Sequence, residues 1–368
     1  MNLKTTRSGL KIGAIAVLAI LMTAGALYSQ RSKIVMQLAK RMVASSTSES
    51  NPIGQLIDGL HVGLCGAGSP FPDPRRSGPC TVVIAGKRMF VFDSGGGSAR
   101  NISRMQLNPG QIEAVFFTHY HSDHIDGLGE LMLTRWIQGN AAAPLPIHGP
   151  QGLLPVLNGF MQAYTADSGW RSAHHGPVVA PPSGFGGTAH VFDIPAETGR
   201  AILIADPDLE IVAFKVQHGP IDPAVGYRIR YKDRTVVISG DTSKSAAIER
   251  EAKGVDLLVH EAQSIELLKL LQAGFKQAGR VALEQVMTDI ENYHTTPEQA
   301  AETAQASGVR MLVMNHIVPP LPSSLLEETF RGQSGEIFRG PIHLGQDFDW
   351  FSLPAGTTRI ESQQRKNF

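Results

Sequence analysis

Short apolar runs alternate along the chain with segments in which apolar residues recur at the spacing of one helix face. The apolar runs predict buried strands at residues 112–117, 211–217, 235–239, 255–259 and 311–314. The periodic segments predict helices at residues 125–138, 152–166, 243–253, 263–291 with breaks, and 297–306. This alternation predicts an α/β fold in which helices cover the sheets.

A cluster of histidines follows directly after the apolar run 112–117. His119, His121 and His124 lie with Asp123 between this predicted strand and the next predicted helix. In extended backbone His119 and His121 project to the same side, whereas Asp123 and His124 begin the following turn. Nitrogen and oxygen ligands suit divalent ions such as zinc. The spacing therefore predicts two adjacent metal sites on a loop between a strand and a helix.

Four further polar residues occupy equivalent positions downstream. Each stands at the carboxyl end of an apolar run: His218, Asp241, His260 and His316. Several strands of a helix-covered sheet can deliver such residues to one edge, where functional sites are commonly assembled. Any one of them alone is also typical of a structural hydrogen bond, but together with the first cluster they favour a metal site.

These residues carry a resemblance to a known family. The chain resembles the metallo-β-lactamase fold hydrolases and, within them, the ribonuclease Z and zinc phosphodiesterase branch. The matching segments are residues 66–70, 72–79, 93–95, 118–124, 226–229 behind His218, 239–242, 260–262, 294–300 and 315–316. The similarity extends over roughly residues 60–354. It implies that the fold is an αββα sandwich of the metallo-β-lactamase type.

The resemblance also implies a ligand set for two Zn²⁺ ions. Seven residues would hold them: His119, His121 and His218 on the first ion, Asp123, His124 and His316 on the second, and Asp241 bridging both. Two such ions clamp an ester oxygen and activate a shared hydroxide. Mn²⁺ and Fe²⁺ bind the same types of ligand, so the sequence does not decide which metal is present.

Three residues take catalytic roles under the same resemblance. Asp123 would orient the attacking hydroxide, and His294 paired with Glu261 would protonate the leaving oxygen. His294 also stands just ahead of the helix expected from residue 297, where Thr296 would be the cap. The two interpretations of His294 are compatible, since the helix would place the histidine. His260 is expected to orient ligands from behind.

Charge and loop lengths argue against tRNA as the substrate. The 33 Lys and Arg residues are balanced by 33 Asp and Glu residues, whereas nucleic-acid binding depends on neutralising phosphates. The ribonuclease Z branch typically carries a basic arm between the third zinc histidine and the bridging aspartate. Here only residues 219–240 separate His218 from Asp241. The longer insertion, residues 151–217, is apolar and partly aromatic, and it predicts a lid over a small-molecule ester.

The primary hypothesis is a dinuclear zinc hydrolase that cleaves phosphodiester bonds of a small substrate with ribonuclease Z-like chemistry. An arylsulfatase would use the same metals and acid on a sulfate ester. A lactonase has less need of the acid formed by His294 and Glu261. A catalytically silent, zinc-binding envelope protein is the alternative outside the enzymes. The sequence leaves the oligomeric state open, a homodimer included.

The N-terminal segment has the features of an export signal or a membrane anchor. Lys4, Arg7 and Lys11 precede the apolar stretch 12–28, an arrangement typical of bacterial secretory signals. We expect a signal or anchor at residues 1–30, a linker at 31–55, the hydrolase domain at 56–358 and a tail at 359–368. The protein would then be periplasmic, either released or held at the inner membrane by its N-terminus.

The chain has two cysteines, Cys65 and Cys80. Their spacing does not make a zinc site. An oxidising compartment would allow a disulfide between them, and two buried free thiols are the alternative.

Overall fold

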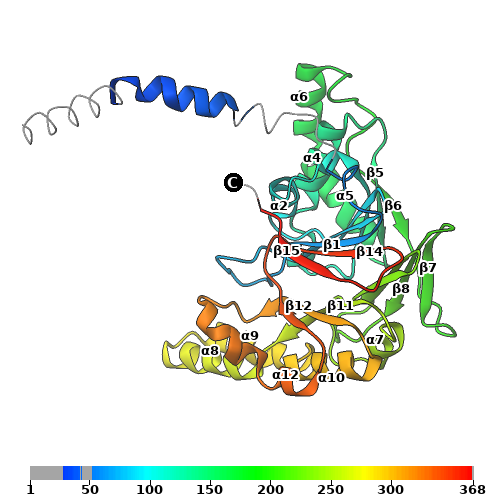
Figure 1. The fold of residues 1–368 in the computed structure, drawn as a ribbon, viewed down its shortest axis with the longest axis vertical. Coiled ribbons are helices and arrows are strands. Elements are labelled where there is room, and N and C mark those ends of the chain that lie inside the picture. The colour runs from blue at the N-terminus through cyan, green and yellow to red at the C-terminus, as the bar shows by residue number, and fades with distance from the viewer. Residues whose placement is uncertain (1–27, 42, 44–51, 367–368) are drawn as a thin grey trace, which may run out of the picture. The chain divides into compact units, whose positions relative to one another are not determined.

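Two β-sheets pack face to face at the centre of the computed structural model of the chain (Figure 1). The structure describes residues 28–41, 43 and 52–366. The chain divides into two units, Met1–Asn51 and Pro52–Phe368. Both sheets belong to the second unit.

The first sheet has eight strands in the order β15-β14-β1-β2-β3-β4-β5-β6. β3 to β6 run parallel to one another, and the other neighbouring strands pair antiparallel. Its strands are β1 (Gly59–Gly66), β2 (Cys80–Ala85), β3 (Arg88–Phe92), β4 (Ile112–Phe116), β5 (Leu145–Gly149), β6 (Gly187–Val191), β14 (Asp349–Pro354) and β15 (Glu361–Gln364).

The second sheet has seven strands in the order β13-β12-β11-β10-β9-β8-β7. β10 to β13 are parallel, and β7 to β10 are antiparallel. Its strands are β7 (Arg200–Ala205), β8 (Leu209–Lys215), β9 (Val225–Tyr231), β10 (Arg234–Ile238), β11 (Leu257–Gln263), β12 (Met311–Val318) and β13 (Ile342–Leu344).

Helices lie on the outer side of each sheet, which gives an αββα order of layers (Figure 1). The first layer contains α2 (Ser98–Arg104), α3 (Ser122–Ile125), α4 (Leu128–Gly139), α5 (Leu153–Ala163) and α6 (Thr165–His175). The second layer contains α7 (Ala246–Glu251), α8 (Ile265–Gln277), α9 (Val281–Asp289), α10 (Pro297–Ser307), α11 (Glu327–Arg331) and α12 (Ser334–Ile337). Three short 3-10 helices complete the list: η1 (Pro109–Gln111), η2 (Ile290–Asn292) and η3 (Ser324–Leu326).

Apolar side chains fill the space between the sheets and beneath each helical layer. Phe90, Phe116 and Tyr227 are buried between the sheets, where the rings of Phe116 and Tyr227 meet edge to face at 5.7 Å. Separate clusters hold each helical layer against its sheet. Because the parallel strands are covered on both faces, they appear in the sequence as continuous apolar runs. The predicted αββα sandwich is confirmed.

The predicted elements differ from the structure mainly at their ends. All five predicted strands are present, as β4, β8, β10, β11 and β12. β11 and β12 continue past residues 259 and 314, because their parallel pairing resumes after an irregularity between Glu261 and Ala262. The expected helix at 263–291 is the pair α8 and α9, and the one at 152–166 is followed by α6.

In the first unit, residues 28–41 are helical. The helix exposes Ile34, Val35 and Leu38. None of the helices in the described part of the chain has both the length and the apolar character needed to cross a bilayer. The predicted signal or anchor falls on residues 1–30, of which 1–27 lie outside the described residues. The signal therefore stays a prediction.

A disulfide joins the first two strands. Cys65 of β1 and Cys80 of β2 are bonded, with their Cα atoms 5.0 Å apart, and both residues are buried. Of the two alternatives that the sequence leaves open, the structure has the bridge. A bridge limits the conformations of the unfolded chain and so stabilises the folded state.

Replacing both cysteines, Cys65→Ala with Cys80→Ala, is expected to lower the free energy of unfolding by about 2–4 kcal/mol, the typical effect of a short closed loop. Chemical denaturation of both proteins without reductant measures this difference. Titration of thiols in the unreduced, unfolded wild type should find none. Two titratable thiols there would contradict the bridge.

Candidate metal centre and active site

Strand ends and one bulge bring the predicted ligands to a single edge of the sandwich. His119 and His121 follow β4, His218 follows β8, and Asp241 follows β10. His316 lies within β12 at a φ of 46°. Its neighbours Asn315 and Ile317 pair with consecutive residues of β11, so His316 is the extra residue of a bulge. Bulges commonly redirect a side chain in this way beside functional sites.

The predicted ligands form two groups with converging donor atoms. In one group, His119, His121, His218 and Asp241 have donor atoms that all lie within 4.8 Å of one another. In the other, the same holds for Asp123, His124 and His316. His121 Nδ1 lies 3.0 Å from His119 Nε2 and 3.3 Å from His218 Nε2. These are the two groups that the sequence resemblance assigned to two ions.

Asp241 lies between the two groups and is only 3% exposed. Its Oδ2 is 3.2 Å from His316 Nε2 and 3.3 Å from His124 Nε2. The same oxygen is 3.8 Å from His218 Nε2 and 3.9 Å from His119 Nε2. One carboxylate oxygen therefore faces ligands from both groups, which is the position that a bridging ligand requires.

The electrostatic field at this edge favours positive charge. Burial lowers the pKa of His124, but the carboxylates of Asp241, Asp123 and Asp93 outweigh it and hold this pKa well above its ordinary value. Burial raises the pKa of Asp241, but the imidazoles of His316 and His124 lower it well below its ordinary value. A site that stabilises a buried imidazolium also stabilises a metal cation.

The first group, by contrast, holds neutral imidazoles. Burial, followed by the charge of His124, lowers the pKa of His119 well below its ordinary value. Burial also lowers the pKa of His218 to about 4. Neutral imidazole is the form that binds metals. His124 Nε2, which points between Asp123 and Asp241, is buried without a hydrogen-bond partner. A buried imidazole nitrogen that faces two carboxylates fits a metal ligand, so the residues present suit a pair of divalent ions.

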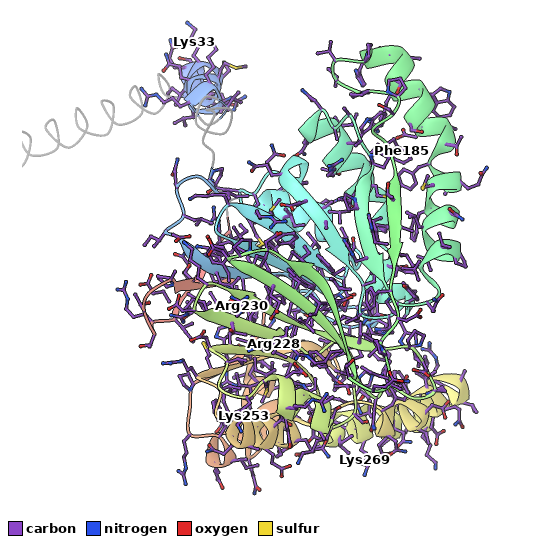
Figure 2. The ribbon with its side chains drawn as sticks, turned by 90° about the vertical axis from the view of Figure 1, so that its right-hand side faces the viewer. Lys33, Phe185, Arg228, Arg230, Lys253 and Lys269 are labelled. Atoms are coloured by element: carbon purple, nitrogen blue, oxygen red, sulfur yellow. A yellow bond between two sulfur atoms is a disulfide. The ribbon has the colours of Figure 1, made fainter. Side chains whose placement is uncertain are left out.

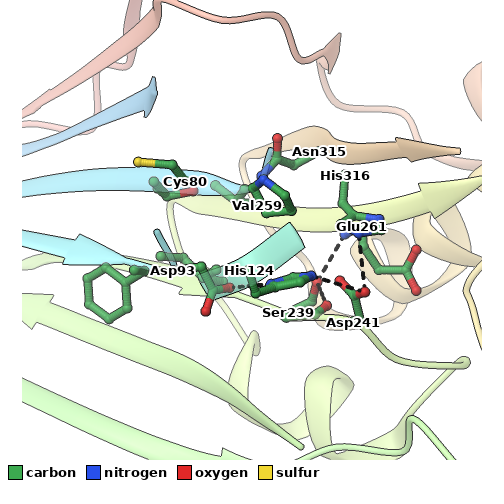
Figure 3. Close-up of a pocket in the computed structure, with 14 residues that line it drawn as sticks. Cys80, Asp93, His124, Ser239, Asp241, Val259, Glu261, Asn315 and His316 are labelled. Carbon is green, nitrogen blue, oxygen red and sulfur yellow. Dashed lines mark hydrogen bonds and ion pairs between the residues drawn. The ribbon is translucent and has the colours of Figure 1, made fainter. Parts of the chain in front are cut away.

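Asp93 fixes the orientation of His124 from behind (Figure 3). Its Oδ2 lies 2.9 Å from His124 Nδ1 and accepts a hydrogen bond of 2.9 Å from the hydroxyl of Thr118. Its Oδ1 accepts the backbone N–H of Thr118 at 2.8 Å. Asp93 itself has a φ of 57°, an unusual value for a residue other than glycine. The sequence marked residues 93–95 as a matching segment but assigned Asp93 no role, because its partners lie 25 and 31 positions away.

The turn that presents Asp241 requires a glycine. Gly240 has a φ of 61°, and a Cβ there would lie 2.6 Å from the carbonyl oxygen of Val225. A side chain at this position would push the turn away from β9 and displace Asp241.

Glu261 connects the turn of Asp241 to the segment of His294. Its Oε1 lies 3.1 Å from His294 Nδ1 and accepts the backbone N–H groups of Thr295 at 3.0 Å and Thr242 at 3.1 Å. Nδ1 is thereby engaged, and Nε2 is the ring nitrogen left for a substrate. Thr296 caps α10 through a capping box with Gln299, so the helix does place His294 as expected. The donor atom of His294 also lies within 4.8 Å of Asp241 and His316.

Comparisons with known proteins agree with this geometry. Residues 88–317 match the family described as "Beta-lactamase superfamily domain". The chain is 34% identical over 290 residues to the ribonuclease Z of Mycolicibacterium gilvum, a match that covers 78% of this chain and 94% of that protein. It is 33% identical to the ribonuclease Z of Mycobacterium avium, with 78% and 96% covered. The chain belongs to the metallo-β-lactamase superfamily, in its ribonuclease Z-like branch.

Solved structures show the same fold. The human tRNase Z, short form, superimposes with a TM-score of 0.55 at 24% identity, covering 80% of this chain and 99% of that one. The metallo-beta-lactamase fold protein YhfI from Bacillus subtilis gives a TM-score of 0.57 at 17% identity, covering 83% and 100%. With the family and the site together, the chain is a metal-dependent hydrolase.

A cavity of about 220 Å³ opens beside the candidate metal centre of this ribonuclease Z-like hydrolase. The site residues that line it are His121, Asp123, Asp241, His294 and His316. The insertion 151–217, expected to be a lid, contributes no lining residue. Its helix α5 packs against the edge strand β6 instead, and α6 contacts α5. Phe185 lies with the first helical layer, opposite Lys269 of α8 (Figure 2). The expected lid is therefore wrong.

Two other histidines do not join the ligand groups. His260 is fully buried, and its Nδ1 lies 2.8 Å from the carbonyl oxygen of Glu261. The ring of His148 stacks between Phe116 and His190, with centroids 4.6 and 4.7 Å apart. Neither lines the cavity beside the candidate metal centre.

Asp93→Asn is expected to weaken metal binding by about 10–100-fold, because an orienting carboxylate behind a ligating histidine has effects of that size. Competition with a chromogenic chelator measures the affinity. The matched control is Asp349→Asn: Asp349 also pairs with a histidine, His343, at 2.7 Å, but that histidine is not among the candidate ligands. The control should bind metal as the wild type does, and equal affinity in Asp93→Asn would contradict the role of Asp93.

Proposed function

We propose that this ribonuclease Z-like hydrolase cleaves phosphodiester bonds in small molecules with two divalent ions, Zn²⁺ by preference. The observation that carries the proposal is one carboxylate, Asp241, whose Oδ2 faces ligands of both groups. Beside it His294 lines the same cavity, and Glu261 contacts His294 Nδ1. One group would hold the first ion, and Asp123, His124 and His316 would hold the second. When bound, such ions supply Lewis-acid polarisation of an ester oxygen and an activated water.

The protein's own groups supply the remaining steps. Asp123 lines the cavity, where its carboxylate can accept a hydrogen bond from the attacking water and fix its direction. His294 lines the same cavity, and Glu261 holds its Nδ1 at 3.1 Å. That contact fixes the orientation of the ring, so that Nε2 can donate a proton to the leaving oxygen. Proton donation by a positioned side chain typically accelerates such a step by about 10²–10⁴-fold.

Two observations support a small substrate. The strands β9 and β10 fill the segment between His218 and Asp241 as a plain antiparallel pair, which leaves no arm to grip RNA. Of the residues in the described part of the chain, no Lys or Arg lines the cavity. A polynucleotide site depends on such charges.

We also propose that the enzyme is exported to the periplasm. The apolar stretch 12–28 supports this, and so does the Cys65–Cys80 bridge, since structural disulfides persist in oxidising compartments. The thiol titration described above, applied to the endogenous protein in periplasmic and cytoplasmic fractions, tests it. Recovery in the cytoplasm with both thiols free would overturn export.

The proposed function is tested by turnover of the metal-loaded protein on a bis-aryl phosphodiester, an aryl sulfate and a lactone, with metal content assayed in parallel. Two zinc ions and preference for the phosphodiester are expected. Preference for the sulfate or the lactone would replace the proposal by a sulfatase or a lactonase. Two zinc ions with no turnover of any substrate would favour a silent binding protein.

His294→Ala is expected to lower kcat on the phosphodiester by about 10²–10⁴-fold with the metal content unchanged, because it removes the proton donor. A matched control is His190→Ala, which removes an exposed histidine outside the cavity and should leave kcat unchanged. Loss of bound metal in His294→Ala would instead identify His294 as a ligand, and unchanged kcat would reject it as the acid.

A further inference from the structure

Two clefts meet at the candidate metal centre. His121 and Tyr293 line both. One is the cavity already described, here called the apolar cleft, whose remaining wall consists of Ser122 and the apolar residues Pro70, Phe71, Val286, Ile290 and Val318. The other is completed by Gly219, Pro220 and Ile221 together with Asp289 and Asn292, and is here called the polar cleft after the last two. A diester has two alcohol groups, and two unequal clefts can distinguish them.

The wall of the apolar cleft is supported from behind by buried apolar side chains. Ile290 and Val318 belong to a small buried cluster with Leu268 and Met287, and Phe71 packs against it. The cluster ties the α8–α9 pair and η2 to the end of β12. Val286, on the same helix as Met287, is 39% exposed at the rim. The wall therefore presents a supported apolar surface to whatever enters the cleft.

The proton donor identifies which alcohol occupies which cleft. His294 lines the apolar cleft and is not among the residues that line the polar cleft. Asp123 and His316 likewise line the apolar cleft and not the polar cleft. Because the acid must reach the leaving oxygen, the leaving alcohol has to lie on the apolar side. The group retained on the phosphate then lies on the polar side.

Building on the proposed function, we infer that the enzyme selects phosphodiesters whose leaving alcohol is apolar, an aryl or alkyl group seated against Phe71, Val286 and Val318. A water oxygen forms the new bond to phosphorus as the bond to the leaving oxygen breaks. The alcohol departs with the proton from His294, and the proton lost by the water replaces it. One water is consumed, and an apolar alcohol and a phosphate monoester are released.

The polar cleft restricts the charge that the retained group of the substrate can carry. Asp289 places an exposed carboxylate there, and among the described residues no Lys or Arg lines either cleft. The nearby lysines of α8 are paired: Lys269 with Glu291 at 3.1 Å and Lys276 with Glu284 at 3.5 Å. A retained group with further phosphates would therefore meet negative charge without a partner. The substrate class is a diester with a single phosphate.

The test is a series of methyl phosphodiesters of phenol, 4-methylphenol, 4-ethylphenol and 4-propylphenol, which have nearly equal leaving-group acidity. With the zinc-loaded full chain, kcat/KM should rise by up to about fourfold for each methylene that becomes buried. Val286→Asp should remove this rise and lower kcat/KM on the propyl ester by about 10–100-fold. The matched control is Val281→Asp on the same helix, since Val281 is 72% exposed and outside both clefts; it should retain the rise.

Calorimetry supplies a readout without turnover. The wild type should bind 4-propylphenylphosphonate more tightly than phenylphosphonate, and Val286→Asp should bind the two with equal affinity. If kcat/KM does not depend on the length of the alkyl chain, or still rises with it in Val286→Asp, the inference is overturned. The proposed phosphodiesterase activity would then remain supported. Absence of turnover on every diester by the zinc-loaded protein would overturn the proposed function itself.

Discussion

The carboxylate of Asp241 sets the main constraint on this structure, because it is buried at the edge of a sandwich and surrounded by imidazoles. A buried carboxylate without a positive partner is strongly unfavourable. His124 and His316 approach it at 3.3 and 3.2 Å, and their charge outweighs burial in its pKa. The turn that carries Asp241 and the bulge that carries His316 are both needed to satisfy it. The fold therefore brings together the carboxylates and imidazoles that a pair of cations would bind.

Glu261 extends that constraint to His294, the proposed proton donor. Its Oε1 accepts from the N–H of Thr242, the residue after the shared aspartate, and from Thr295, the residue after His294. The same oxygen faces His294 Nδ1. The distance between the candidate metal centre and His294 is therefore set by one side chain on β11. A change in either turn would be transmitted to the other through this carboxylate.

Much of the site could be predicted from the sequence because its signals are local. The histidine cluster follows one strand directly, and each later ligand stands near the end of an apolar run, so strand prediction was sufficient to expect them at one edge. The same pattern included His260, which is not a ligand, and only the family resemblance separated the ligands into two groups. Asp93 had no such signal, since its role depends on Thr118 and His124, which are remote in sequence. The bulge at His316 could not be predicted from the sequence either, because it arises from the pairing of β11 with β12. The position of the lid was wrong for the same reason: composition does not reveal at which edge of a sheet an insertion packs.

The cavity wall and the metal centre are held by different interactions, and this separates selectivity from catalysis. The wall rests on its own apolar cluster around Leu268, Met287 and Val318. The centre rests on carboxylates and imidazoles at the strand ends. On the proposed function, substitutions in the wall would alter which alcohol is accepted without disturbing the ligands, and substitutions behind the ligands would alter metal affinity without reshaping the wall.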